Sequence, residues 1–248
     1  MLVYGVNPVV EALSARPEAV ERVLVAEGAK VHDLDRIYEL ARSAGVRVER
    51  VPRDRIAKLA PGAVHQGVVA QLAELAHVAV EDLVAKAKAS GEPPLLLALD
   101  QVQDPIHLGV AIRCAHAFAA HGVIIPQDRA AQLTPAAIKA SAGAASHLSV
   151  ARTVNLTRAL EELKEQGIWA VGADMDGEPC DRVDLTGPIC LVVGSEGKGL
   201  RPLVKRTCDR VVAIPMARAA VGSLSASAAA GILLYEIDRQ RRSGPGRR

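Results

Sequence analysis

The run Leu95-Leu96-Leu97-Ala98-Leu99 decides the fold of the larger, C-terminal part of this chain. Five consecutive apolar residues predict a short strand that is buried on both faces. Four similar runs follow it, at 123–125, 168–171, 189–193 and 211–214. Helical patterns lie around 109–121, 156–166, 200–206 and 224–241. Buried strands that alternate with helices predict an α/β domain with a parallel sheet covered on both faces. Ligands bind beyond the carboxyl ends of such strands, so we expect the functional residues in the loops that follow the runs.

Residues 1–72 have an α/β pattern of their own. A helix is expected at 7–13, with Asn7 as N-cap and Pro8 as its first residue. The other expected elements are strands at 20–26, 46–51 and 67–72 and a helix at 34–44. Residues 73–94 contain one helical stretch, at 80–89, and the turn-rich Ser90-Gly91-Glu92-Pro93-Pro94, which is typical of a linker. We therefore divide the chain into an N-terminal domain at 1–72, a linker at 73–94 and a C-terminal domain at 95–248.

Bulk properties narrow the class of protein. Half of the residues are hydrophobic, which is enough for a full core, and the formal charge is only +2. The four cysteines have no metal-ligand spacing, and no signal peptide or membrane-spanning run is apparent. We expect a soluble, cytoplasmic protein without a metal. The basic end RQRRSGPGRR is either a phosphate contact or a solvated tail.

The loop after the first run leads into an apolar helix that carries one charge. It reads Asp100-Gln-Val-Gln-Asp104-Pro105-Ile-His107-Leu-Gly109-Val-Ala-Ile-Arg113. A charge among Ala, Ile, Val and Cys is rare unless it is paired. Arg113 therefore either forms a structural ion pair, with Asp100 or Asp104, or serves a function, and the residues alone leave both interpretations open.

Two further loops are rich in small residues. Gly194-Ser-Glu196-Gly-Lys-Gly199 follows the run at 189–193, and its glycines allow a close approach of backbone to a ligand, although an ordinary tight turn has the same composition. It matches neither a dinucleotide-binding fingerprint nor a phosphate loop. The third loop begins at Ile214 and leads into a helix of small residues. Such a helix suits close packing against a cofactor or another helix, and Ser223 is a candidate N-cap.

In their order and spacing, the three loops resemble motifs 1, 2 and 3 of the SpoU/TrmH RNA methyltransferases of the SPOUT class, and most closely those of the RlmB subfamily. Other segments of the chain resemble the same family, namely Val3–Pro8, Gly62–Gly67, Lys139–Ala144, Val150–Leu156 and Gly231–Glu236. The resemblance covers nearly the whole chain, and three motifs in order are a specific signal.

The resemblance implies a fold, a cofactor and a reaction. The C-terminal domain would contain a deep trefoil knot, and the N-terminal domain would recognise RNA. The implied reaction is SAM-dependent 2′-O-methylation of a ribose in RNA, in this subfamily a guanosine of 23S rRNA. Members are homodimers whose active sites draw on the partner subunit. The implied cofactor-binding residues are Gly194, Glu196, Gly199, Ile214, Met216, Ser223 and Leu224.

The resemblance also implies catalytic residues, namely Arg113, Ser223, His107 and Ser225. His107 and Ser225 stand where the family pattern has Asn. The enzyme would then use a rearranged hydrogen-bond network, act on a different RNA, or bind SAM and RNA while methylating weakly. The family assigns proton removal to Arg113. Because a guanidinium has a pKa above about 12, stabilising a developing alkoxide is the better physical role for Arg113.

Three other functions compete with this one. A non-catalytic protein of the same fold, acting in ribosome assembly, would bind rRNA without methyl transfer. A methyltransferase of this class that acts on a base nitrogen would lack the Asp-Pro, Leu-Gly and Arg arrangement of the first loop. A nucleotide-binding metabolic enzyme would need a phosphate loop, which we do not find.

Overall fold

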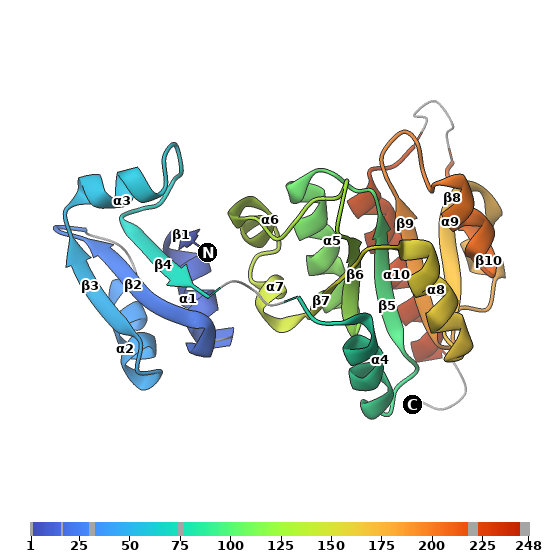
Figure 1. Ribbon diagram of the computed structural model, residues 1–248, viewed down its shortest axis with the longest axis horizontal. Coiled ribbons are helices and arrows are strands. Elements are labelled where there is room, and N and C mark those ends of the chain that lie inside the picture. The colour runs from blue at the N-terminus through green and yellow to red at the C-terminus, as the bar shows by residue number, and fades with distance from the viewer. Residues whose placement is uncertain (1, 16, 30–32, 74–76, 218–222, 244–248) are drawn as a thin grey trace. The chain divides into compact units, whose positions relative to one another are not determined.

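The computed structural model describes residues 2–15, 17–29, 33–73, 77–217 and 223–243 (Figure 1). By its internal contacts the chain divides into two compact units. The first unit comprises 1–76 with 142–147, and the second comprises 77–141 with 148–248.

The first unit is built on a four-stranded sheet in the order β1-β4-β2-β3. Strand β4 pairs antiparallel with β1 and β2, and β3 pairs parallel with β2. Buried side chains from β2, β3, α3 and β4 form its core, among them Leu24, Val51, Ile56 and Val69. Its elements are β1 (Leu2–Tyr4), α1 (Val6–Ala15), η1 (Pro17–Ala19), β2 (Val20–Ala26), α2 (Leu34–Ser43), β3 (Arg47–Val51), α3 (Arg53–Leu59) and β4 (Val68–Leu72), together with the short α7 (Ala144–His147).

The sequence predicted the strands at 20–26, 46–51 and 67–72 and the helix at 34–44, all to within a residue. The start of α1 was predicted wrongly. The helix begins at Val6, and the backbone N–H of Val9 donates to the carbonyl of Gly5 at 3.2 Å, so Asn7 lies in the first turn and is not the cap. Strand β1 and helix α3 were not predicted, because β1 is short and α3 is mostly charged.

The second unit is built on a six-stranded sheet in the order β10-β8-β9-β5-β6-β7, and every pair of neighbours is parallel. The predicted parallel sheet is confirmed. The short β7 was missed, and β8 runs far beyond the predicted stretch at 168–171. The strands are β5 (Leu95–Asp100), β6 (Gly122–Pro126), β7 (Val150–Thr153), β8 (Trp169–Pro179), β9 (Ile189–Gly194) and β10 (Arg210–Ala213).

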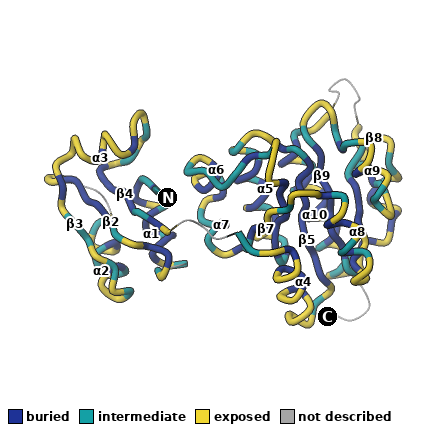
Figure 2. Tube along the Cα trace, viewed as in Figure 1, coloured by how far each residue is buried: buried dark blue, intermediate teal, exposed yellow. Residues whose placement is uncertain are grey.

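Helices cover this sheet on both faces (Figure 1). Alternate residues of β5, such as Leu96 and Ala98, pack with α4, α8 and α9 in one buried cluster, and α5 and α10 pack together across the other face. Figure 2 shows the strands as buried and the outer sides of the helices as exposed. The helices are α4 (Val80–Ala89), α5 (Pro105–Ala117), α6 (Pro135–Ala140), α8 (Leu156–Glu165), η2 (Cys180–Arg182), α9 (Pro202–Thr207) and α10 (Ala226–Ser243).

Helix α4 has the predicted bounds and lies inside the stretch that the sequence assigned to a linker. Its residues Val80, Leu83 and Val84 belong to the buried cluster of the second unit. Two leucine methyl carbons lie so close to Gly122 that a Cβ there would clash with them. This helix is therefore part of the second core.

The basic end of α10 is occupied by contacts within the chain. The guanidinium of Arg241 donates to the carbonyls of Pro93, Pro94 and Gly187 at 2.6–3.0 Å, and burial lowers its pKa. Arg242 pairs with Asp238 at 2.9 Å. The described part of the basic run is thus an ordered helix end and not a solvated tail, and 244–248 lie outside the described residues.

Among the described residues, no helix combines the length and the apolar character that a membrane crossing requires.

Candidate active site

The first and second loops meet at the carboxyl edge of the sheet, where β5 pairs with β9 along Leu95–Asp100. Strand β5 has β6 on its other side, so the chain changes direction across the sheet at this point, which is where parallel sheets open a crevice. Asp100 is fully buried and binds the two loops together. Its carboxylate accepts from Arg201 Nε at 2.7 Å and from the Arg201 backbone N–H at 2.8 Å.

This ion pair decides the structural interpretation of Arg113. Asp100 is taken by Arg201, and Asp104 caps α5 by accepting from the backbone N–H of Ile106 at 2.7 Å. The side chain of Arg113 is exposed, and within the described residues no hydrogen bond or ion pair engages it. Of the two interpretations that the residues left open, the ion pair with Asp100 or Asp104 is therefore wrong. The helix also begins four residues before the predicted 109, because the Asp104-Pro105 pair starts it.

The glycine turn, residues 194–199, closes on itself. The backbones of Ser195 and Gly199 exchange two hydrogen bonds, at 2.9 and 3.1 Å. A Cβ on Gly194 would clash with the backbone of Gly199, and Gly197 and Gly199 have φ angles of 75° and 64°, which favour glycine. The glycines are thus required by the turn itself. Because they carry no side chains, the backbone of the turn is accessible from the adjoining pocket.

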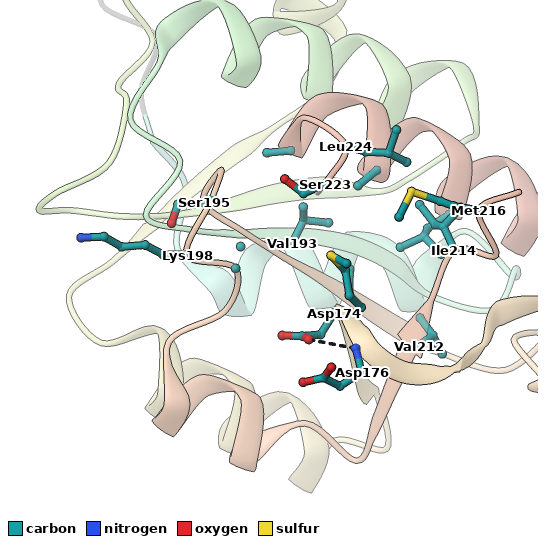
Figure 3. Close-up of a pocket in the computed structure, with 18 residues that line it drawn as sticks. Asp174, Asp176, Val193, Ser195, Lys198, Val212, Ile214, Met216, Ser223 and Leu224 are labelled. Atoms are coloured by element: carbon teal, nitrogen blue, oxygen red, sulfur yellow. Dashed lines mark hydrogen bonds between the residues drawn. The ribbon is translucent and has the colours of Figure 1, made fainter. Parts of the chain in front are cut away.

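A pocket of about 590 Å³ lies beside this turn, a size that is typical of small-molecule sites. Figure 3 shows Leu224 facing Ile214 and Met216 across an apolar part, while Asp174 and Asp176 lie at another side. The residues that line it come from β8, β9, the glycine turn, β10, the following loop and α10: Ala173, Asp174, Met175, Asp176, Val193, Gly194, Ser195, Gly197, Lys198, Gly199, Val212, Ile214, Met216, Ser223, Leu224, Ala226, Ala229 and Leu233.

The two carboxylates are the site residues that the sequence reasoning missed. They lie on the part of β8 beyond its apolar run, and the alternation Asp174-Met175-Asp176 was the available signal. Lys205 of α9 lies 3.0 Å from Asp174 and 3.5 Å from Asp176, and its hydrogen bond to Asp174 is the main reason that its pKa is raised. The lysine holds both acceptors in place at the pocket.

His107 and Ser225 come together outside the lining of the pocket. His107 Nδ1 lies 3.0 Å from Ser227 Oγ, and Ser227 Oγ lies 3.3 Å from Ser225 Oγ. The other ring nitrogen, Nε2, lies 3.2 Å from Glu196 Oε1 and 3.8 Å from Asp104 Oδ2. This network joins α5, the glycine turn and the start of α10.

Ser225, and not Ser223, occupies the capping position of α10. Its Oγ accepts from the backbone N–H of Ala228 at 3.2 Å, and its carbonyl accepts from that of Ala229 at 2.9 Å. The helix accordingly begins at Ala226, two residues after the predicted start. Ser223 is instead free to face the pocket, which it lines.

The structure thus separates the predicted site residues into three groups. Six of the seven predicted cofactor-binding residues line the pocket: Gly194, Gly199, Ile214, Met216, Ser223 and Leu224. Glu196 belongs to the same turn, but its carboxylate lies against His107. Arg113 is exposed on α5 and does not line the pocket.

The chemistry of the pocket suits a small molecule with a flat apolar part and several polar groups. The apolar part accommodates a ring, the bare backbone of the turn offers hydrogen bonds, and the two carboxylates accept from hydroxyl or ammonium groups. Among the described residues, no group of three or more His, Cys, Asp or Glu side chains is placed to hold a metal ion.

Sequence comparisons assign both parts of the chain. The profile described as "SpoU rRNA Methylase family" matches residues 94–235, and that described as "RNA 2′-O ribose methyltransferase substrate binding" matches residues 2–78. A protein of Mycobacterium sp. (strain KMS), named as a tRNA/rRNA methyltransferase, is 46% identical over 244 residues, covering 98% of this chain and 77% of the relative. A protein of Bacillus subtilis (strain 168), named as a TrmH family tRNA/rRNA methyltransferase, is 43% identical over 240 residues, covering 96% and 95%.

Solved structures agree with these matches. The SpoU methyltransferase AviRb from Streptomyces viridochromogenes, crystallised with AdoMet, is similar with a TM-score of 0.82 and 29% identity over 99% of this chain and 91% of that one. An RNA methyltransferase of the TrmH family from Porphyromonas gingivalis is similar with a TM-score of 0.75 and 26% identity, over 98% and 90%.

Proposed function

The chain belongs to the SpoU rRNA methylase family, and from this premise we propose that it transfers a methyl group from SAM to the 2′-hydroxyl of a ribose in RNA. The observation that carries the proposal is the pocket of about 590 Å³ that is lined by the glycine turn and by Ile214, Met216, Ser223 and Leu224. Its lining includes six of the seven positions to which the family resemblance assigns the cofactor. The similar AviRb was crystallised with AdoMet.

We assign the cofactor contacts within this pocket. Ile214, Met216 and Leu224 would hold the adenine ring by their apolar side chains. Asp174 and Asp176 would accept hydrogen bonds from the hydroxyl or ammonium groups. Gly194, Gly199 and Ser223 would contribute backbone and hydroxyl contacts. Glu196 would act through its place in the turn, because its carboxylate faces His107.

The protein's part in the reaction is positioning and electrostatics. When bound, SAM supplies a methyl group on a sulfonium, which an oxygen nucleophile attacks in line. The chain must hold the ribose oxygen about 3 Å from that carbon, which is worth several kcal/mol of the barrier. Arg113 would neutralise the charge that develops on the oxygen, and its guanidinium has no competing partner among the described residues.

We propose that a second copy of the chain completes the site. Arg113 does not line the pocket of its own chain, yet α5, which carries it, packs against α10, where Ile232 and Tyr235 form an exposed apolar face and the ring of Tyr235 contacts the half-buried Phe118 that follows α5. A homodimer that buries this face would deliver Arg113 to the partner's pocket. Mixing inactive R113A protomers with inactive G194A protomers should then restore part of the activity, because one of the two sites in the mixed dimer is intact.

The remaining assignments follow from the family. We propose that residues 1–72 recognise RNA, that 73–94 connect this domain to the methyltransferase domain at 95–248, and that the latter is knotted. The RNA is a ribosomal RNA in the cytoplasm, and the target is a guanosine of 23S rRNA. The second candidate is a protein that binds SAM and RNA with weak or no catalysis. It is favoured by the fact that His107 and Ser225 both hydrogen-bond Ser227 instead of offering the amides of the family pattern.

One experiment tests both candidates. Ribosomal RNA from cells with and without the gene is digested to nucleosides and analysed by mass spectrometry, and purified protein is assayed with labelled SAM on 23S rRNA transcripts. The proposal predicts a 2′-O-methylguanosine that disappears with the gene and reappears in vitro. Calorimetric binding of SAM and RNA without methyl incorporation would favour the second candidate, and methylation of a base would contradict both.

A further inference from the structure

The relay chain is our name for the side chains Ser225, Ser227 and His107, which are joined by hydrogen bonds, together with Glu196, whose Oε1 lies 3.2 Å from His107 Nε2. The donors and acceptors that are available give its direction. A carboxylate only accepts, so we place the ring hydrogen of His107 on Nε2, the nitrogen that faces Glu196. A neutral imidazole has one donor and one acceptor, so Nδ1 accepts, and the Ser227 hydroxyl donates to it. Ser227 Oγ then accepts from the hydroxyl of Ser225. With the ring hydrogen on Nε2, both hydrogen bonds point from Ser225 toward the imidazole, and Nε2 faces Glu196 at 3.2 Å.

The first member of the relay chain is able to accept one more hydrogen. Ser225 Oγ has two lone pairs, and the backbone N–H of Ala228 donates to one of them at 3.2 Å. Within the described part of the chain, no donor engages the other. A hydroxyl group that donated to Ser225 would stand at the head of two hydrogen bonds that lead to the imidazole.

Both ends of the relay chain adjoin the pocket. Ser225 lies between Leu224 and Ala226, which line it, and Glu196 lies between two lining residues of the glycine turn. The middle is shielded, since Ser227 is only 6% exposed, while the side chain of Glu196 is 48% exposed. The path thus begins at the rim of the pocket, passes through the protein and ends at a carboxylate in contact with water.

We propose that the relay chain removes the proton of the ribose 2′-hydroxyl, an inference that rests on the 2′-O-methylation proposed above. As the O–H bond breaks, its proton passes to Ser225 Oγ. The hydroxyl proton of Ser225 then passes to Ser227 Oγ, and that of Ser227 passes to His107 Nδ1. The Nε2 proton moves to Glu196, which releases it to water. The ribose oxygen gains the methyl group as the carbon–sulfur bond breaks and its electron pair stays on sulfur, so one proton is released per methyl transferred.

The relay explains both departures from the family pattern. A histidine takes up a proton at one ring nitrogen and gives one up at the other, whereas the amide of an asparagine donates and accepts without passing a proton. A serine hydroxyl at 225 donates and accepts through one atom, as a relay requires. The relay chain also supplies a base for the proton of the 2′-hydroxyl. Arg113 cannot be that base, because a guanidinium stays charged.

The charged groups that face the imidazole are both acidic. Glu196 approaches from the glycine turn, and Asp104 Oδ2 lies 3.8 Å away at the start of α5. Helix α10 presents only the neutral Ser227.

The first test breaks the relay chain at its shielded link. S227A removes one oxygen from a residue that does not line the pocket, and S243A at the far end of α10 is the matched control. SAM affinity by calorimetry should stay unchanged in both. The single-turnover rate should fall about 10²-fold in S227A, as expected for loss of general-base catalysis. E196Q, which keeps an oxygen facing His107 but removes the carboxylate that takes the proton, should likewise slow transfer.

The second test needs no activity. In ¹⁵N-resolved spectra of the histidine rings in the free protein, the His107 signals are those that H107N removes. They should show the hydrogen on Nε2 and an accepting Nδ1 whose shift changes in S227A. A hydrogen on Nδ1 would contradict the direction of the relay chain.

The two levels of inference fail in different ways. Methyl transfer at the same rate in S227A and S243A overturns the relay and leaves the proposed function standing. Methylation of a base, or of no RNA at all, by the unsubstituted protein overturns the proposed function and the relay with it.

Discussion

Removal of the Arg201 side chain should loosen the whole active site, because this residue holds a fully buried carboxylate. In R201A, Asp100 keeps only the backbone N–H of residue 201 and loses its charged partner at 2.7 Å. Breaking a buried ion pair on one side costs about 3–5 kcal/mol. The Arg201 side chain is 42% exposed, so water can replace part of the contact, and we expect about 2 kcal/mol.

The assay follows the second unit alone. The chain has one tryptophan, Trp169 at the start of β8, so its fluorescence reports the unfolding of the six-stranded sheet. A loss of about 2 kcal/mol lowers Tm by roughly 4–8 °C in a domain of this size. SAM affinity should fall as well, because Asp100 ties the segment after Gly199 to β5.

The control is R158A, which removes an exposed ion pair with Glu162 on α8 and should leave Tm unchanged. An R201A variant whose Tm and SAM affinity equal those of R158A would refute the reasoning. It would show that Asp100 is satisfied without the guanidinium.

Four further outcomes are expected. Burial lowers the pKa of His121 below its ordinary 6.5, so the unfolded chain takes up a proton before the folded chain does. The free energy of unfolding should therefore decrease as pH falls below about 6.5, and H121N should flatten that dependence in denaturant titrations. R241K should destabilise the second unit by about 1–3 kcal/mol in the same titrations, because a lysine cannot reach three carbonyls at once. G194A should weaken SAM binding about tenfold or more by calorimetry, since a Cβ clashes with the turn; unchanged affinity would argue against the pocket. R113A should lower kcat/KM about 10²–10³-fold while SAM affinity stays the same, and a parallel loss of SAM binding would place the guanidinium at the cofactor instead.

Much of the fold was predictable because most strands of the second sheet are buried on both faces. Residues 95–99 and 189–193 are apolar throughout, and such runs are visible without any partner. The second half of β8 is half exposed and polar, so the same criterion stopped at 171 and missed Asp174 and Asp176. The two missed carboxylates thus lie on the half-exposed part of β8.

The site was predictable where glycines and loop order define it and not where side chains pair over long separations. The turn at 194–199 shows its constraint in its composition. The pairing of Asp100 with Arg201 and the contact of His107 with Ser227 join residues that are 101 and 120 positions apart. Nothing local distinguishes Arg201 from Arg113 as the partner of Asp100, so the residues alone left open whether Arg113 forms an ion pair.

The strand order has a consequence during synthesis of the chain on the ribosome. The central strand β5, which lies between β6 and β9 in the sheet, begins at Leu95, but β9 begins only at Ile189. At about 5–20 residues per second this interval lasts roughly 5–20 s, during which one edge of the buried strand β5 has no partner strand. Nascent chains stalled between these two points should accordingly be the form that chaperones capture and that aggregates first.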